Sequence, residues 1–120
     1  MDTKLTGRFG ERYAADCLKK KKYRIVGMNY SCRFGEIDII AENRQYIVFV
    51  EVKLRKDARF AAAREFVTAA KQDRIRKTAL LWLSQNPSEK QPRFDVIELY
   101  APEGERSENI RINHIENAFE

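Results

Sequence analysis

Two apolar segments separated by a short polar turn constrain the fold of this chain most strongly. Residues 35–42 (GEIDIIAE) and 45–54 (QYIVFVEVKL) are rich in branched and aromatic side chains, and Asn43-Arg44 lies in the polar link between them. Segments of this length and composition are typical of β-strands, and so short a link joins them in antiparallel order. The sequence therefore predicts a β-hairpin with Asn43-Arg44 as its turn.

The hairpin gathers acidic side chains on one face. With a two-residue turn, Asp38 lies opposite Phe49 and Glu36 lies opposite Glu51. Side chains alternate along a strand, so even positions of the first arm share a face with odd positions of the second. The expected members of this face are Glu36, Asp38, Glu51 and Lys53. The expectation depends on register, because one inserted or missing turn residue would move one strand's side chains to the other face.

The remaining segments predict a single α/β domain over residues 1–120, with a central mixed sheet flanked by helices. Helices are expected over residues 4–21 and 63–85, and further strands over residues 23–30, 94–100 and 110–115. Asn86-Pro87 ends the second helix. At 120 residues with 43% hydrophobic side chains, the chain is long enough and apolar enough for one hydrophobic core.

Glu11 stands out in the first helix. The apolar stripe of that helix is expected to consist of Leu5, Phe9, Tyr13 and Cys17. Glu11 belongs to the adjoining stripe with Ala14 and Leu18, at the edge of the buried face, where a charge needs a partner or a function. Two interpretations remain open: an ion pair at the rim with Arg8 or Arg12, or a place in a functional site.

Composition narrows the function classes. The net charge is +5, which fits a polyanionic partner, although solvated helix faces explain part of it. The candidate nucleic-acid-binding residues are Arg55, Lys56, Lys71, Gln72, Arg74 and Arg76. The single histidine, His114, excludes multi-histidine zinc sites, and no GxxxxGK phosphate loop is present.

Targeting signals are absent from the sequence. No apolar run approaches a membrane span, and no signal-peptide core follows the first residues. Cys17 and Cys32 form no metal or redox motif and are expected to be reduced, buried thiols. We therefore expect a cytoplasmic protein without membrane attachment, and a homodimer is one candidate for its oligomeric state.

Glu51-Val52-Lys53 carries the chemical interpretation. Glu51 and Lys53 point to the same face, with Asp38 near them in the hairpin. Carboxylate oxygens suit Mg²⁺ or Mn²⁺, and a lysine meets the negative charge of a phosphate. Taken alone, the pattern is also common where a strand leaves the core, since both side chains then reach water and pair weakly.

The chain resembles the YraN-like family of small bacterial proteins, within the restriction-endonuclease-like PD-(D/E)xK superfamily. Archaeal Holliday-junction resolvases are the nearest members of that superfamily in layout. The matching segments cover nearly the whole chain: GRFGERYAADCL, NYSCRFGEIDIIAE, YIVFVEVKLR, RFDVIEL and HIENAF. The resemblance implies a restriction-endonuclease-like fold and a nuclease-type site.

The resulting hypothesis is a Mg²⁺-dependent endonuclease acting on DNA, with branched or recombination intermediates among the candidate substrates. Asp38, Glu51 and the Val52 carbonyl would bind the metal. Lys53 would position or deprotonate the attacking water. Glu11 would orient that water or contact a second metal. Lys71 or Gln72 would contact the scissile phosphate.

Two alternatives remain. The first is a nucleic-acid-binding module that keeps the fold without cutting. The second is a partner-binding scaffold whose acidic cluster is structural.

Overall fold

One five-stranded mixed sheet organises the chain. The computed structural model describes residues 3–55 and 67–120. The elements in chain order are α1 (Thr3–Lys20), β1 (Arg24–Cys32), β2 (Gly35–Glu42), β3 (Tyr46–Arg55), α3 (Ala69–Gln85), β4 (Gln91–Tyr100), the 3₁₀ turn η2 (Gly104–Arg106) and β5 (Arg111–Phe119). The predicted α/β class with a mixed sheet is confirmed, and the arrangement is compatible with a restriction-endonuclease-like fold. Residues 63–66 of the predicted second helix lie outside the described residues, and the described helix begins at Ala69.

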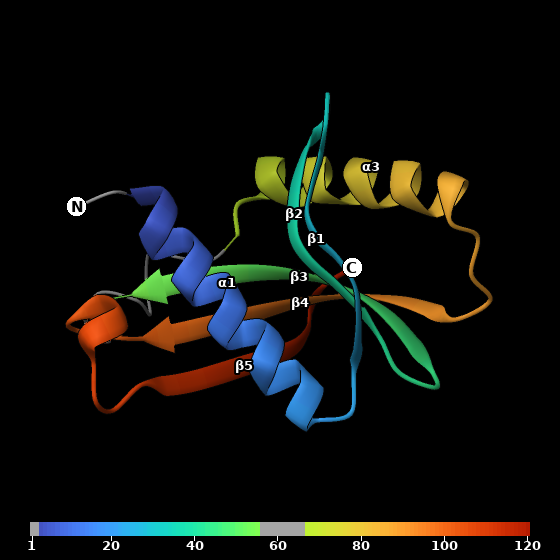
Figure 1. Cartoon of the computed structure of the whole chain (residues 1–120). Coiled ribbons are helices and arrows are strands. Elements are labelled where there is room, and N and C mark those ends of the chain that lie inside the picture. Colours follow the sequence, from blue (N-terminus) through green and yellow to red (C-terminus); the bar gives the residue numbers. More distant parts are fainter. Residues whose placement is uncertain (1–2, 56–66) are drawn as a thin grey trace.

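The strands are ordered β1-β2-β3-β4-β5 across the sheet. All neighbouring pairs are antiparallel except β3 and β4, which are parallel and are connected through α3. Figure 1 shows α1 crossing one side of the sheet, with α3 on the other side beyond the β1–β2 hairpin. None of the described helices is long and apolar enough to cross a membrane.

β3 is the centre of two cores, one on each face of the sheet. Val48 and Val50 belong to the cluster formed with α1, whereas Ile47 and Phe49 belong to the cluster formed with α3. All four are at most 1% exposed. A strand covered on both faces needs a continuous apolar run rather than an alternating one, which explains the sequence from Ile47 to Val50.

The buried face of α1 is centred on small side chains. Ala14 and Leu18 are 0% exposed, whereas Tyr13 and Cys17 are only partly buried. The stripe predicted through Tyr13 and Cys17 is therefore not the most buried one. A Cβ at Gly10 would lie 3.6 Å from the Leu54 Cβ, an ordinary van der Waals distance, which shows that α1 packs closely on β3 at this position. This close approach carries the stripe that contains Glu11 toward the sheet.

The predicted hairpin register is wrong by two residues. Ile40 pairs with Phe49, so Asp38 does not lie opposite Phe49. Asn43 Oδ1 accepts hydrogen bonds from the amides of Gln45 (2.9 Å) and Tyr46 (2.8 Å), which places the bend one residue later than predicted. A shift of two residues preserves the alternation of faces, so the expected shared face survives the error.

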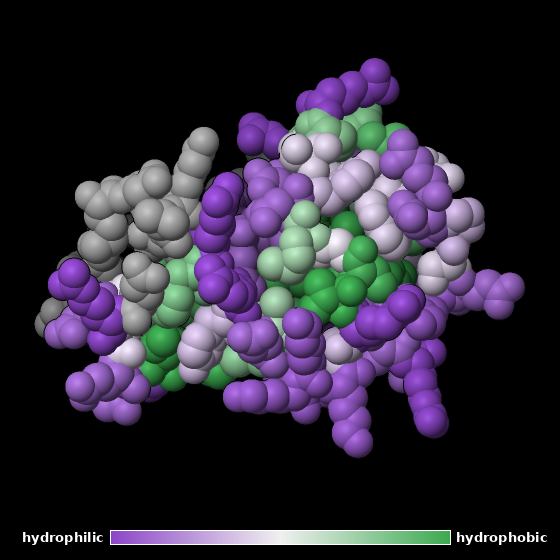
Figure 2. All heavy atoms as spheres, viewed as in Figure 1, coloured by the Kyte–Doolittle hydropathy of each residue, from purple (hydrophilic) through white to green (hydrophobic). Residues whose placement is uncertain are grey.

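β2 and β3 separate partway along their length. Their pairing ends at Ile39 and Val50, although β3 continues beside β4 as far as Arg55. Figure 1 shows the β1–β2 hairpin curving away from the other strands toward α3. Residues 51–53 of β3 are therefore not paired with β2, and we call the place where the two strands part, beside these residues, the opening. Polar side chains cover most of the molecular face seen in Figure 2.

Candidate functional site

The opening between β2 and β3 is where the candidate residues meet. Asp38 lies on β2 just beyond the last pair of the ladder, and its Oδ2 accepts a hydrogen bond of 2.8 Å from the Val52 amide. The side chain thus replaces the backbone acceptor that a continuing β2 would have supplied. The N–H and C=O of one strand residue point to the same neighbour, so the Val52 carbonyl also faces the opening.

Three carboxylates from two elements lie together at this opening. Glu11 of α1 and Glu36 and Asp38 of β2 each bring one oxygen to within 4.8 Å of the others. Burial raises the pKa of Glu11 above its ordinary value, and the charges of Glu36 and Glu51 act in the same direction. Asn29 offsets part of this effect through a side-chain hydrogen bond to Glu11.

Asp38 is the most strongly perturbed acid of the group. Burial, followed by the negative charge of Glu51, raises its pKa from 3.8 to about 7. The hydrogen bond from the Val52 amide opposes this shift but does not cancel it. Near neutral pH the Asp38 carboxyl is therefore poised between a protonated form and a charged form that needs a cation.

Glu51 has the opposite surroundings. The residue is 7% exposed, and its Oε1 lies 2.6 Å from Lys71 Nζ and 3.5 Å from Lys53 Nζ. Burial and the neighbouring Lys71 lower the pKa of Lys53. For Lys71, burial is the largest single effect and acts downward too, but the hydrogen bond to Glu51 and the Glu51 charge, with smaller contributions from Lys53 and Asp38, together outweigh it and raise the pKa. Lys71 thus holds the proton more firmly, and Lys53 is nearer to the neutral amine that accepts one.

The predicted members of this site therefore lie around one opening, although they come from four elements. Glu11 and Asp38 lie within the carboxylate group, and Lys53 and Lys71 flank Glu51. Glu36, which the hairpin pattern had placed on this face, joins them. Their catalytic and metal-binding roles stay predictions.

Comparison with known proteins identifies the family of this chain. The model of "Uncharacterised protein family UPF0102" matches residues 10–99, which include every acidic residue of the opening. The chain belongs to the UPF0102 family.

UPF0102 relatives match over nearly their whole length. A UPF0102 protein of Caldanaerobacter subterraneus subsp. tengcongensis is 45% identical over 99% of this chain and 98% of its own. One of Caldicellulosiruptor bescii is 43% identical over 99% of this chain and 100% of its own. One of Syntrophomonas wolfei subsp. wolfei is 40% identical over 94% of this chain and 96% of its own.

Among the predicted nucleic-acid-binding residues of this UPF0102 protein, those that the structure describes have different surroundings. Arg55 is buried and its Nε lies 2.9 Å from Glu98 Oε2, so it has an internal partner. Arg74 is exposed on α3. Lys56 lies outside the described residues.

Gln72 and Arg76 are engaged with each other and with nearby backbone. Gln72 Nε2 donates to the Val67 carbonyl (2.9 Å), and its Oε1 accepts from Arg76 Nη2 (3.1 Å). The Arg76 guanidinium lies over the Phe119 ring, 5.6 Å from its centroid, and donates to the Glu120 carbonyl. Of the α3 residues predicted to contact phosphate, Lys71 is therefore the one at the opening.

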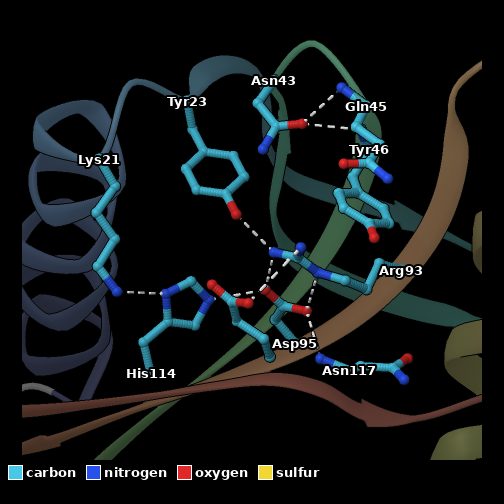
Figure 3. A network of polar contacts seen from close by, with 10 residues as sticks. Lys21, Tyr23, Asn43, Gln45, Tyr46, Arg93, Asp95, His114 and Asn117 are labelled. Carbon is cyan, nitrogen blue, oxygen red and sulfur yellow. Dashed lines mark hydrogen bonds and ion pairs between the residues drawn. The ribbon is translucent and has the colours of Figure 1, made fainter.

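A second polar network in the UPF0102 protein was not anticipated from the sequence (Figure 3). Asp95 of β4 is 0% exposed, and both of its oxygens accept from Arg93, with Nε–Oδ1 at 2.9 Å and Nη2–Oδ2 at 2.8 Å. His114 Nε2 lies 2.7 Å from Asp95 Oδ2, and the Asn117 amide donates to Oδ1. Arg93 and Asp95, two residues apart on one strand, were the available signal, because such a pair shares a face.

The same network reaches the end of α1. Arg93 Nη2 donates to the Tyr23 hydroxyl (2.6 Å), and Lys21 Nζ lies 2.9 Å from His114 Nδ1. A protonated lysine can only donate, so His114 Nδ1 accepts and Nε2 carries the proton toward Asp95. We call these residues, Lys21, Tyr23, Arg93, Asp95, His114 and Asn117, the β4 clamp. These contacts connect the end of α1 with β4 and β5, and Arg93 Nη1 also lies 3.9 Å from Glu116 Oε2, which indicates a structural role.

Proposed function

We propose that this protein is a metal-dependent phosphodiesterase that cuts DNA at the opening between β2 and β3. The observation that carries the proposal is the gathering of Glu11, Glu36, Asp38 and Glu51 beside Lys53 at the point where the two strands part. Carboxylates so close together destabilise one another unless a cation or proton lies among them. The lowered pKa of Lys53 beside these carboxylates favours a functional site over a purely structural acidic cluster, because perturbed pKa values gather at functional sites.

The residues present fit a hard divalent cation. Asp38 and Glu51 offer carboxylate oxygens, and the Val52 carbonyl faces the same opening. Oxygen donors of this kind are the ligands that Mg²⁺ and Mn²⁺ prefer. A bound cation would favour the charged form of Asp38, whose pKa is raised by burial and by the charge of Glu51. When bound, the metal would polarise the phosphate and stabilise its developing charge.

The protein's own groups would perform the proton transfer. Lys53, whose pKa is lowered by burial and by Lys71, would accept a proton from the attacking water or hold that water in line. Glu11, with its raised pKa, would orient the water from the α1 side of the opening. The net positive charge of the chain would favour a polyanionic substrate.

The test is cleavage of linear, flapped and four-way DNA by the purified protein in Mg²⁺ or Mn²⁺. Lys53→Ala is expected to lower the cleavage rate about 100-fold or more, because it removes the proton acceptor. Asp38→Asn is expected to lower the rate similarly and also to weaken Mn²⁺ binding, because it removes a charged ligand. Lys53→Ala should leave Mn²⁺ affinity nearly unchanged, so the two variants separate by metal affinity.

Matched controls come from the exposed ion pair of Asp73 and Lys77 on α3, whose Oδ2 and Nζ atoms are 3.0 Å apart. Asp73→Asn and Lys77→Met should cut like the wild type. Equal cleavage by the wild type and the Lys53→Ala variant would place the active site elsewhere. Salt-sensitive DNA binding without cleavage would favour the binding-module alternative, and binding that is insensitive to salt would favour a protein partner.

A further inference from the structure

The Glu51 carboxylate shares one oxygen between two ammonium groups. Lys53 belongs to the same strand as Glu51, whereas Lys71 comes from the first turn of α3. The shorter contact, 2.6 Å against 3.5 Å, is the one made by the helix residue. The tighter ion pair at the opening is therefore a tertiary contact between α3 and β3.

Asp38, unlike Glu51, has no lysine in an ion pair with it among the described residues. Its hydrogen-bond donor is the Val52 amide, and among the ion pairs of the described residues none includes Asp38. A divalent cation entering the opening would thus meet Asp38 without an ammonium group ion-paired to it, whereas the Lys71 charge acts on Asp38 only through space. At Glu51 it would meet the Lys71 ammonium, and two cations cannot occupy one carboxylate oxygen without strong repulsion.

The Lys71 side chain has the freedom to leave. Thr68 caps α3, and its Oγ1 accepts from the Lys71 amide at 3.2 Å, so the backbone at residue 71 is fixed. The side chain itself is 40% exposed, and its flexible stem lets the ammonium move while the helix stays in place.

We propose that Lys71 is a displaceable counterion of Glu51, which passes to a phosphodiester oxygen when a divalent cation takes the carboxylate. This inference rests on the proposed function and identifies Lys71 as a positioning residue for the substrate phosphate. The cation releases Lys71, and the phosphate then keeps it away from Glu51. Metal and phosphate should therefore strengthen each other's binding, and the metal should bind weakly to the free protein.

The experiment is a titration of DNA-free protein with Mn²⁺, followed by the spin-resonance signal of the unbound ion. Lys71→Met is expected to tighten Mn²⁺ binding about fivefold, the value of a partly exposed ion pair. Lys71→Arg keeps the competing charge and should bind Mn²⁺ like the wild type. Lys77→Met removes an equal charge from the same helix but away from Glu51, so its effect should stay below about twofold.

The outcomes separate the two proposals. Suppose that Asp38→Asn weakens Mn²⁺ binding but Lys71→Met leaves the affinity unchanged or lowers it. The proposal that the metal displaces Lys71 is then wrong, whereas the proposed metal site is retained. If neither the wild type nor the Lys71→Met variant binds Mn²⁺, both proposals fail. If Lys71→Met and Lys77→Met tighten Mn²⁺ binding equally, the cause is the lower net charge of the protein, and the proposed displacement of Lys71 from Glu51 is wrong. Circular dichroism of each variant checks that α3 is retained.

Discussion

Asp38 links the electrostatics of the opening to the stability of the protein. In the unfolded chain this carboxyl has the ordinary pKa of 3.8, whereas in the folded protein burial and Glu51 raise its pKa to about 7. Between about pH 4 and about pH 7, the Asp38 carboxyl is therefore more protonated in the folded state than in the unfolded state. Stability from this group is fully present below about pH 4 and is lost as the pH rises to about 7.

This linkage predicts how Asp38→Asn changes the pH profile. In the metal-free protein with a chelator, the variant should gain stability over the wild type as the pH rises from about 4 to about 7, by more than about 1 kcal/mol. Urea unfolding across this range measures the difference between the two curves. Parallel curves would mean that the Asp38 carboxyl is not protonated at neutral pH in the folded state.

Residue patterns predicted the members of the opening unevenly. Glu51 and Lys53 could be found because alternation along one strand is enough to place them together. Lys71 could be predicted only as one of several basic residues on a helix, because its contact with Glu51 depends on how α3 packs on the sheet. The roles of Gln72 and Arg74 could not be separated from that of Lys71 by sequence, since only the packing decides which of them reaches the opening.

At the scale of elements, the hairpin shows why an incorrect register still gave a useful prediction. The turn chemistry of Asn43 moved the bend by one residue and the pairing by two. Only an odd shift would have sent Asp38 to the opposite face from Glu51. What the sequence could not predict is the separation of β2 from β3 after Ile39, because it depends on how the β1–β2 hairpin curves toward α3.

Gly35 fixes the start of β2, the strand that carries Glu36 and Asp38. Its φ of +153° is rare for residues with a side chain, and an added Cβ would lie 3.4 Å from Thr78 Oγ1 and 3.5 Å from the Arg74 Cβ. Gly35→Ala is therefore expected to destabilise the protein by about 1–3 kcal/mol. Urea unfolding monitored by Trp82 fluorescence measures the loss.

Gly10→Ala is the matched control for this prediction. Gly10 lies within α1, and its added Cβ would make ordinary contacts of 3.6 Å or more. Because alanine favours a helix over glycine, the change should be neutral or stabilising by up to about 1 kcal/mol. Equal destabilisation by both substitutions would show that close packing, rather than the backbone conformation of Gly35, sets the cost.

At the scale of the whole molecule, the β4 clamp joins parts of the chain that are far apart in sequence. Tyr23 follows α1, Arg93 and Asp95 lie on β4, and His114 and Asn117 lie on β5 (Figure 3). Arg93 also lies over the ring of Tyr46 at the start of β3, 4.5 Å from its centroid. The sequence indicated only the Arg93/Asp95 pair and not the network, because a single histidine and an Arg-x-Asp pair are common and their convergence depends on the complete sheet topology.

The clamp predicts the largest stability loss of any single polar substitution proposed for this protein. Asp95→Asn removes the charge that accepts from Arg93 and His114, and it leaves the Arg93 guanidinium, 8% exposed as a residue, without its charged partner. Breaking a buried ion pair from one side costs about 3–5 kcal/mol, so Asp95→Asn is expected to destabilise the protein by at least about 3 kcal/mol in urea unfolding at neutral pH.

The acid limb of the stability curve tests the same clamp. Burial alone would raise the pKa of Asp95, but hydrogen bonds from His114, Arg93 and the Asn117 amide hold it below the ordinary 3.8. The stability from this group is present above that ordinary value and is lost as the pH falls through the lower folded value. Asp95→Asn should therefore remove part of the acid sensitivity of the wild type.

Asp73→Asn, in the exposed pair with Lys77, is the control and should cost no more than about 1 kcal/mol at neutral pH. A similar small cost for Asp95→Asn would contradict the clamp, because the Arg93 charge would then be satisfied without Asp95.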